Sequence, residues 1–386
     1  MKTVFAVIIR EGKRILHTRL SLWGFFIIPL LATLLFFGIY YKAYVLHVPT
    51  VVVDKDQTAT SRQMTRMLNL QRYLKVESTS TDFAQAVRKI HSQKAYILIY
   101  LPSGFEKNLI KYNQPTLRSY SFGTNLLIGR LAQKAVVECV TALNKERESA
   151  QLEKMRQESV YTRHTGTQPE LVVHNLFNPG YNYLFYMSPA VTLSLWQMLL
   201  LLLMIPMFTK EWEKDRYSEL NKTAEKRVMA VYAGKLFFPT LIMVAQYLIM
   251  QYGFFTLFHL PIHGNFWVGL IIMVLFFRSV MNLAVIISNV IRQSLFSTEI
   301  GVFLTAPAFA FSGYTFPFYE MPLFHRLFAW LMPSTHVLPV YSLFYLQKAP
   351  LSVILEESVP LFIYFVSSTL LALYVIKKNI RPGVSV

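Results

Sequence analysis

Six stretches of the chain are almost entirely apolar over a length that can cross a bilayer. About 20 such residues are needed, because the hydrocarbon layer is about 30 Å thick and a helix rises about 1.5 Å per residue. The runs are Leu20–Leu46, Leu184–Phe208, Leu236–Leu260, Phe266–Ile291, Ile300–Phe316 and Val359–Ile376. The pattern therefore predicts six transmembrane helices. A large buried helical core is the alternative, but several of the runs lack any polar face.

A shorter pattern precedes the first run. In Val4–Leu16 apolar residues fall on one side of a helix and basic residues on another, which is typical of a helix in the membrane interface. We therefore expect residues 1–19 to form a cytoplasmic amphipathic helix and residues 20–46 to form the first transmembrane helix. A cleaved signal peptide is the alternative, but its apolar core is usually shorter and a small-residue cleavage pattern follows it.

The positions of Lys and Arg orient the predicted helices. Basic residues gather before the first run, in the loop at residues 209–231 and in the tail at residues 377–386, whereas the short loop His259–Asn265 has none. Cytoplasmic loops carry this excess of positive charge, so both termini are expected on the cytoplasmic side. Residues 47–183 then lie outside the membrane, and residues 184–376 hold the other five helices.

Composition narrows the class of protein. Of 386 residues, 54% are hydrophobic and only 15% are charged, which argues against a soluble enzyme or a disordered protein. The net charge of +17 raises the question of nucleic acid, but the cytoplasmic loops and residues 47–183 account for much of it, so no nucleic-acid partner is expected. The single cysteine, Cys139, lies on an apolar helical stripe and is expected in a core.

Residues 47–183 are polar enough to fold in water. Apolar runs predict strands near residues 49–53, 74–77, 96–101 and 117–122, and helical spacing predicts helices over 61–74 and 83–91. This alternation indicates a small α/β domain. A long helix is expected over 125–159. Its charged second half has too few apolar positions to pack alone, so we expect it to contact either a second protomer or an envelope adaptor, with a solvated helix as the alternative.

The sequence carries no constellation for catalysis. It has no G-x-x-x-x-G-K-[ST] phosphate loop, and Gly234-Lys235 stands alone at the foot of a predicted helix. His259 and His263 are four residues apart, but Pro261 separates them and no glutamate follows the first histidine. We therefore predict no catalytic, cofactor-binding or metal-binding residue, and an intramembrane hydrolase is disfavoured.

Three further features stand out. The loop at residues 209–231 concentrates charges around Trp212 and Leu220, which predicts a cytoplasmic helix that contacts a partner, with a solvated turn as the alternative. Residues 317–347 are aromatic and interrupted by prolines, which predicts a re-entrant pair of short helices in the outer leaflet. Arg278 lies in the middle of the fourth run and is expected to face protein or water, as a tie between helices or as a substrate contact.

Two of these segments carry motifs of a known family. Residues 312–322 read Ser-Gly-Tyr-Thr-Phe-Pro-Phe-Tyr-Glu-Met-Pro, and residues 331–336 read Leu-Met-Pro-Ser-Thr-His. A second pattern of this family has the form E-x-E-x-G-T-x-E-x-L and ends in Gly-Lys. The residues that fit it here are Glu211, Glu213, Glu219, Leu220, Gly234 and Lys235, although Tyr217-Ser218 replaces the usual Gly-Thr pair and Ala224 replaces a usual proline. These motifs resemble the permease subunit of ABC-2-type ATP-binding-cassette exporters. The strand before Asp54 and the Leu-Pro-Ser-Gly-Phe run at residues 101–105 resemble the subgroup with a large extracytoplasmic domain after the first helix.

The resemblance implies a multi-pass half-transporter in the inner (cytoplasmic) membrane. Two copies, or one copy and a homologue, would enclose a pathway that moves an amphiphile, such as a drug, a lipid or a lipid-linked molecule, outward. Separate ATPase subunits would bind ATP, so this chain needs no cofactor. The rival interpretation is a non-transporting membrane receptor or envelope-interaction protein that acts through residues 47–183. The residues implied in ATPase coupling are Glu211, Trp212, Glu213, Glu219 and Leu220, and those implied in the re-entrant segment are Gly313, Pro317, Pro322 and Pro333.

Overall fold

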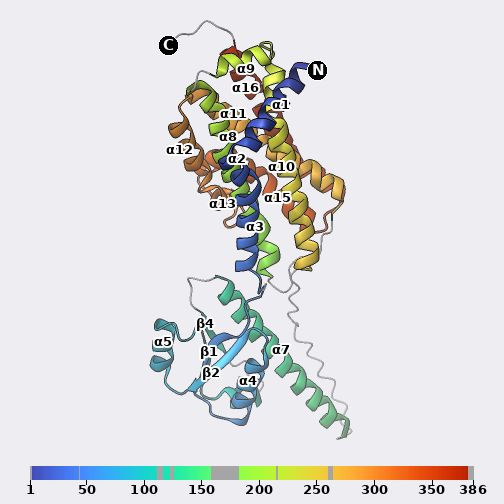
Figure 1. Cartoon of the computed structure of the whole chain (residues 1–386). Helices are drawn as coiled ribbons and strands as arrows, with labels where there is room; N and C mark the ends of the chain where they lie inside the picture. The colour runs from blue at the N-terminus through green and yellow to red at the C-terminus, as the bar shows by residue number, and fades with distance from the viewer. Residues whose placement is uncertain are drawn as a thin grey trace. The chain divides into compact units, whose positions relative to one another are not determined.

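The computed structural model describes residues 2–42, 44–110, 116–121, 126–157, 182–213, 216–259 and 264–380. It divides into two compact units (Figure 1). One combines Met1–Ala43 with Asn175–Val386, and we call it the membrane unit. The other is Tyr44–His174, and we call it the α/β unit.

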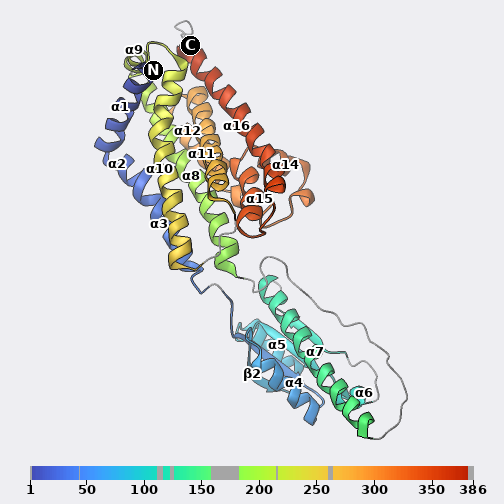
Figure 2. The ribbon, with the colours of Figure 1, turned by 90° about the vertical axis from the view of Figure 1, so that its right-hand side faces the viewer.

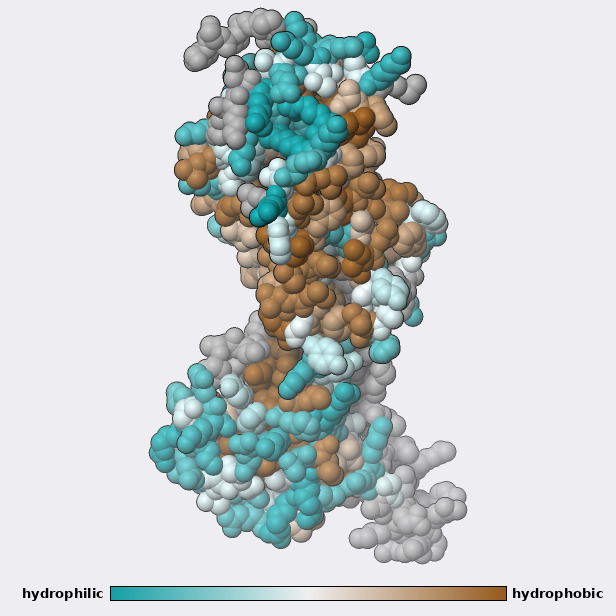
Figure 3. All heavy atoms as spheres, viewed as in Figure 1, coloured by the Kyte–Doolittle hydropathy of each residue, from teal (hydrophilic) through white to brown (hydrophobic). Residues whose placement is uncertain are grey.

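The membrane unit is built from helices over its described part. The N-terminal helices are α1 (Lys2–His17), α2 (Arg19–Leu22), the π-helix Trp23–Ile27 and α3 (Ile28–Ile39). The later helices are α8 (Tyr183–Glu213), α9 (Tyr217–Thr223), α10 (Val228–Leu257), α11 (Phe266–Ile291), α12 (Ser294–Thr305), α13 (Ala308–Phe311), the 3-10 turn Phe318–Glu320, α14 (Leu323–Trp330), α15 (Pro333–Tyr345) and α16 (Leu351–Ile380). On the face drawn in Figure 3, apolar residues cover the middle of this unit, and polar residues cover the end that holds α9.

Four helices of the described chain are long and apolar enough to cross a membrane: α8, α10, α11 and α16. A fifth candidate is the pair α14 and α15, which is bent by 84° and is either a broken span or a re-entrant loop. By length and composition, the structure thus supports four of the six expected spans, and the bent pair lies outside all six apolar runs. The bent pair covers most of residues 317–347, where the sequence predicted two short re-entrant helices.

Two expected spans are shorter than their apolar runs. The first run continues as helix only to Ile39, and its regular part is interrupted by the π-helix Trp23–Ile27. The helix that corresponds to the fifth run is α12, which begins at Ser294, before the run, and ends at Thr305. Pro307 follows as the N-cap of α13, and because proline has no N–H and clashes with the preceding turn, it explains why α12 stops there.

The centre of the membrane unit is α11, which packs against α8, α10 and α16. Polar side chains tie three of these helices together. The Tyr232 hydroxyl of α10 donates to Asn282 Oδ1 of α11 at 2.8 Å, and the Asn282 amide donates to Ser368 at 3.1 Å and Thr369 at 2.8 Å on α16. Such bonds satisfy polar groups that would be costly to leave unpaired in a low-dielectric interior.

The α/β unit contains one mixed sheet of four strands in the order β2-β1-β3-β4. Its strands are β1 (Val48–Asp54), β2 (Leu74–Ser80), β3 (Ile97–Leu101) and β4 (Arg118–Ser121), and its helices are α4 (Ala59–Leu70), α5 (Phe83–His91), α6 (Phe105–Ile110) and α7 (Leu126–Gln157). β1 pairs in parallel with β2 and β3, and β4 is antiparallel to β3. The α/β organisation predicted for this segment is therefore present.

Both faces of the sheet are covered. Val52 and Ile99 pack on one face with α4 and α7, whereas Val51 and Leu98 pack on the other with α5. Cys139 of α7 is fully buried in the first of these cores, as its place on an apolar stripe predicted. Burial raises the pKa of its thiol to about 11, which makes it an unreactive core residue.

Asp56 closes the carboxyl end of the sheet between β1 and β3. Its carboxylate accepts hydrogen bonds from the backbone N–H groups of Gly104 (2.7 Å), Phe105 (3.1 Å) and Glu106 (2.9 Å), and from the Thr58 hydroxyl. Partial burial opposes the charge, but these hydrogen bonds outweigh it and hold the pKa of Asp56 below its usual range. The acidic residue after β1 and the Pro-x-Gly-Phe element after β3 therefore form one structural link.

Candidate functional site

The candidate site lies where the N-terminal helix α1 packs along the start of α10 (Figure 2). The buried stripe of α1 recurs every four residues, at Thr3, Val7, Glu11 and Ile15. Gly234 of α10 permits the close approach of α1, because a side chain at this position would overlap Val7. Because Glu11 falls on the stripe that faces the protein, the packing of α1 carries a carboxylate into the interior.

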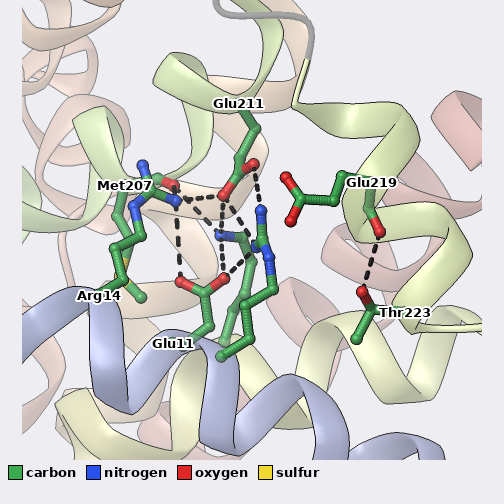
Figure 4. A network of polar contacts seen from close by, with 8 residues as sticks. Glu11, Arg14, Met207, Glu211, Glu219 and Thr223 are labelled. Carbon is green, nitrogen blue, oxygen red and sulfur yellow. Dashed lines mark hydrogen bonds and ion pairs between the residues drawn. The ribbon is translucent and has the colours of Figure 1, made fainter.

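Five charged side chains meet at this interface, from α1, α8 and α10 (Figure 4). Lys235 Nζ lies 3.2 Å from Glu11 Oε1 and 3.1 Å from Glu211 Oε1, and it also donates to the Met207 carbonyl at 3.2 Å. Arg10 binds Glu211 with both of its terminal nitrogens, at 3.2 and 3.0 Å, and contacts Glu11 at 2.5 Å.

The fifth charge is Arg14, which pairs with Glu211 and lies 3.8 Å from Glu11 Oε2. We call Arg10, Glu11, Arg14, Glu211 and Lys235 the ion network.

The ion network is closed to solvent at its centre. Lys235 and Glu11 have exposed side-chain fractions of 0%, and Glu211 has 1%. Three cations surround two carboxylates, so each carboxylate has more than one counter-ion. Burial lowers the pKa of Arg10, but hydrogen bonding and the charge of Glu211 outweigh it, and the net shift is upward. Removing one member of a buried ion group leaves an uncompensated charge, which costs about 3–5 kcal/mol. The ion network therefore joins α1, α8 and α10 only while it is complete.

The segment after Glu211 turns back onto the same helices. The rings of Trp212 and Tyr217 stack with centroids 3.7 Å apart, and the Arg292 guanidinium lies 4.7 Å from the centroid of the Trp212 ring. Leu220 of α9 is 1% exposed and belongs to the core of the membrane unit. A push on α9 would therefore be transmitted to α8 and α11 through packed side chains.

The structure places the five residues predicted for ATPase coupling in different environments. Glu211 and Leu220 are buried in the chain itself, Trp212 is half-buried, and Glu219 is exposed. The side chain of Glu213 lies outside the part of the chain that the structure describes. The exposed charged side chains of α9 and the following turn are instead Glu219, Lys222, Glu225, Lys226 and Arg227.

The residues of the predicted re-entrant segment each mark a turn or a helix start. Gly313 has a φ of +82°, a conformation that residues with a Cβ rarely adopt. Pro317 is the N-cap of the 3-10 turn Phe318–Glu320, Pro322 is the N-cap of α14, and Pro333 is the first residue of α15. Proline favours such positions, because its fixed φ suits a helix start and its missing N–H is not needed there.

Arg278 lies half-buried at the centre of α11, with its guanidinium carbon 4.8 Å from the centroid of the Tyr232 ring of α10. It also lines a shallow groove on the side of α10. Among the described residues, no contact joins Arg278 to the ion network or to the re-entrant segment.

Sequence reasoning missed the role of Glu11. Its signal was available, because Glu11 is the only acidic residue of α1 and lies on the spacing of Thr3, Val7 and Ile15. Lys235 was noticed only as part of a Gly-Lys pair. Both halves of that pair now have a physical reason: the glycine admits α1, and the lysine neutralises the carboxylates. Among the described residues, no group of three or more His, Cys, Asp or Glu side chains could hold a metal ion.

Comparison with known proteins gives this geometry a context. The sequence model of the ABC-2 family of transporter proteins matches residues 19–374. The probable multidrug ABC transporter permeases YbhR of Escherichia coli K12 and of Escherichia coli O157:H7 are each 23% identical to the chain over 350 residues. Each match covers 87% of this chain and 88% of the relative.

Proposed function

Because the chain belongs to the ABC-2 family of transporter proteins and is a permease subunit of an exporter, we propose that it is a half-transporter with six membrane spans. It pairs with a second copy or a homologue, and separate ATPase subunits bind the ATP that drives it. Both termini face the cytoplasm, the α/β unit faces outward, and the protein resides in the inner membrane. This orientation is supported by the basic residues around α9 and at the end of α16.

Two shorter helices complete the six spans. Arg19–Ile39, taken through its π-helix, has a length of about 31 Å at 1.5 Å per residue, which matches the hydrocarbon thickness. α12 is about 18 Å long and continues after Pro307 into α13, so this span is broken by a proline. Broken helices are tolerated in membranes where protein or water satisfies the freed backbone groups.

The ion network is the observation that carries the coupling mechanism. It fixes α1 and α10 to the end of α8, next to α9. ATPase subunits that close on the exposed charges of α9 push on a segment that cannot yield locally, because Trp212 and Leu220 are packed beneath it. The movement passes to α8, α10 and α1 together. In this mechanism Glu211 acts inside the permease, and Glu219 is the residue that meets the partner.

The pathway carries an amphiphile, and α12 offers a surface of that chemistry. One side of α12 packs on α8 through Ser297, Gly301 and Thr305. The other side bears a groove of about 470 Å³ lined by Leu295, Thr298, Glu299, Val302, Phe303 and Ala306. Glu299 is exposed there, although it is the only charged residue of α12. A carboxylate on an apolar wall suits a substrate with apolar parts and a positive charge.

α7 supplies a contact outside the membrane unit. The last residue of α7 in the described core is Leu143, although the helix continues to Gln157. We propose that residues 144–157 bind a second protomer or an envelope adaptor. Deletion of residues 144–157 should leave membrane insertion intact and change the size of the purified complex.

The function is tested by reconstituting the chain with its ATPase in proteoliposomes and measuring ATP-dependent movement of a fluorescent amphiphile. Export requires both subunits and stops when the ATPase is inactive. A chain that retains no ATPase on purification and moves no amphiphile would instead support a receptor that acts through the α/β unit.

A further inference from the structure

A groove on the side of α10 combines an arginine with an apolar floor. It has a volume of about 330 Å³ and is lined by Ala233, Phe237, Thr240, Leu241 and Val244 of α10 and by Arg278 of α11. Phe237 and Leu241 are 46% and 53% exposed, so the groove opens on the accessible surface of the helix bundle and not into its core. A lipid-facing arginine at the middle of a helix costs about 2.5–3.5 kcal/mol on insertion scales, so its presence on this surface requires an explanation.

Among the described residues, no carboxylate forms an ion pair with Arg278. Its guanidinium lies over the Tyr232 ring, 4.8 Å from the centroid, and none of the ion pairs of the described chain includes it. The Tyr232 hydroxyl is engaged with Asn282, so the ring is held in place as a platform beneath the cation. Arg278 is thus positioned, half-exposed, and able to bind an anion.

The charge lies at one end of the groove. Tyr232 is only four residues after Val228, where α10 begins, so the guanidinium is held near that end of the helix. From Tyr232 to Val244 the helix rises about 18 Å, which is close to the thickness of one leaflet, half of about 30 Å. A cation at one end of an apolar groove that is about one leaflet long has the shape and polarity of a site for one phospholipid.

We propose that this groove binds an anionic glycerophospholipid of the cytoplasmic leaflet, with its phosphate on Arg278 and an acyl chain along Phe237, Leu241 and Val244. Just before α10, Arg227 pairs with Glu225 at 3.4 Å, and the exposed Lys226 beside them leaves a net positive charge at the same end, which favours a lipid with net negative charge. Assignment to the cytoplasmic leaflet rests on the orientation proposed above, whereas binding itself does not depend on transport.

The test uses the full chain purified with its ATPase and reconstituted in nanodiscs of phosphatidylcholine with a minor fraction of phosphatidylglycerol. After transfer to detergent, native mass spectrometry counts the phosphatidylglycerol that stays bound. Wild type should retain it in preference to phosphatidylcholine, and Arg278→Gln should reduce retention about tenfold, because a charge-assisted contact is lost. Arg292→Gln is the matched control, since Arg292 also lies over an aromatic ring, that of Trp212; it should retain the lipid.

A second variant leaves the charge in place. Leu241→Trp fills the groove and should displace the acyl chain, so that retention falls while Arg278 is intact. Equal retention by wild type and both variants would overturn the proposal, as would retention of phosphatidylcholine equal to that of phosphatidylglycerol. Dissociation of the permease dimer by Arg278→Gln, without any change in lipid retention, would also overturn it and assign the groove to a protomer contact. Since no readout requires export, loss of the proposed transport function leaves this result interpretable.

Discussion

Lys235 and Glu11 form an ion pair of 3.2 Å although neither side chain exposes any surface to solvent. They belong to α10 and α1, which are far apart in sequence, and Glu211 of α8 shares the same lysine at 3.1 Å. A buried pair of this kind adds little stability compared with apolar side chains of the same size, but its loss is costly. It therefore acts as a specific link between α1, α8 and α10.

Glu211→Gln should damage the protein far more than Glu219→Gln. Loss of the Glu211 charge leaves three cations around one carboxylate in a closed site, and the expected cost is about 3–5 kcal/mol. Glu219 is exposed on α9, where a charge pair contributes about 0–1 kcal/mol. The measurement is thermal unfolding of the purified complex together with substrate-stimulated ATP hydrolysis. Equal effects of the two substitutions would contradict the assignment of Glu211 to the ion network.

Gly234→Val should release α1 from α10. The added side chain would overlap Val7, and such overpacking typically destabilises a protein by about 1–3 kcal/mol. Hydrogen exchange of the α1 amides should accelerate about 5- to 160-fold, which is the same range of energies expressed as a ratio. Gly253→Val is the matched control, because a side chain at Gly253 of the same helix meets no atom within 4 Å among the described residues. Unchanged exchange in α1 would show that it is held by other contacts.

The four long apolar helices, the α/β unit and the core position of Cys139 could be predicted because each depends on a local pattern of apolar residues. The ion network could not, because its members come from three segments and only packing reveals which side of α1 faces the protein. The sequence predicts that Glu211 contacts a partner, yet Glu211 lies within the last turn of α8 and is buried inside the chain. The predicted ends of the first and fifth spans are wrong because hydrophobicity continues past Ile39, where α3 ends, and past Pro307, which follows α12.

The α/β unit should lose part of its stability at acid pH through Asp56. The folded pKa of Asp56 is lowered, so its contribution is complete above the unfolded value of 3.8 and is lost as pH falls through the folded pKa. Asp56→Asn should therefore weaken protection of the Gly104–Glu106 amides at pH 6, and the difference from wild type should vanish below the folded pKa. The measurement is hydrogen exchange of the full chain, corrected for the intrinsic pH dependence. A difference that persists unchanged at low pH would indicate that the carboxylate charge is not involved.

Glu299→Gln should change which amphiphiles are exported rather than whether export occurs. Glu299 is exposed in the groove of α12, between Leu295 and Phe303, which are 71% and 76% exposed. If a cationic substrate passes along this wall, loss of a charge-assisted contact should lower its export about tenfold, whereas a neutral amphiphile of similar size should be exported as before. Proteoliposomes that contain the permease and its ATPase allow both substrates to be measured in one preparation.

Glu356→Gln provides the matched control, since Glu356 is an exposed carboxylate near the start of α16 and does not line this groove. It removes the same charge from the membrane unit and should leave the ratio of cationic to neutral export unchanged. An equal decrease for both substrates in Glu299→Gln would point to a structural role of Glu299. An unchanged ratio with full export would place the substrate path on another face, because a carboxylate that lines the path cannot be neutral toward the sign of the substrate charge.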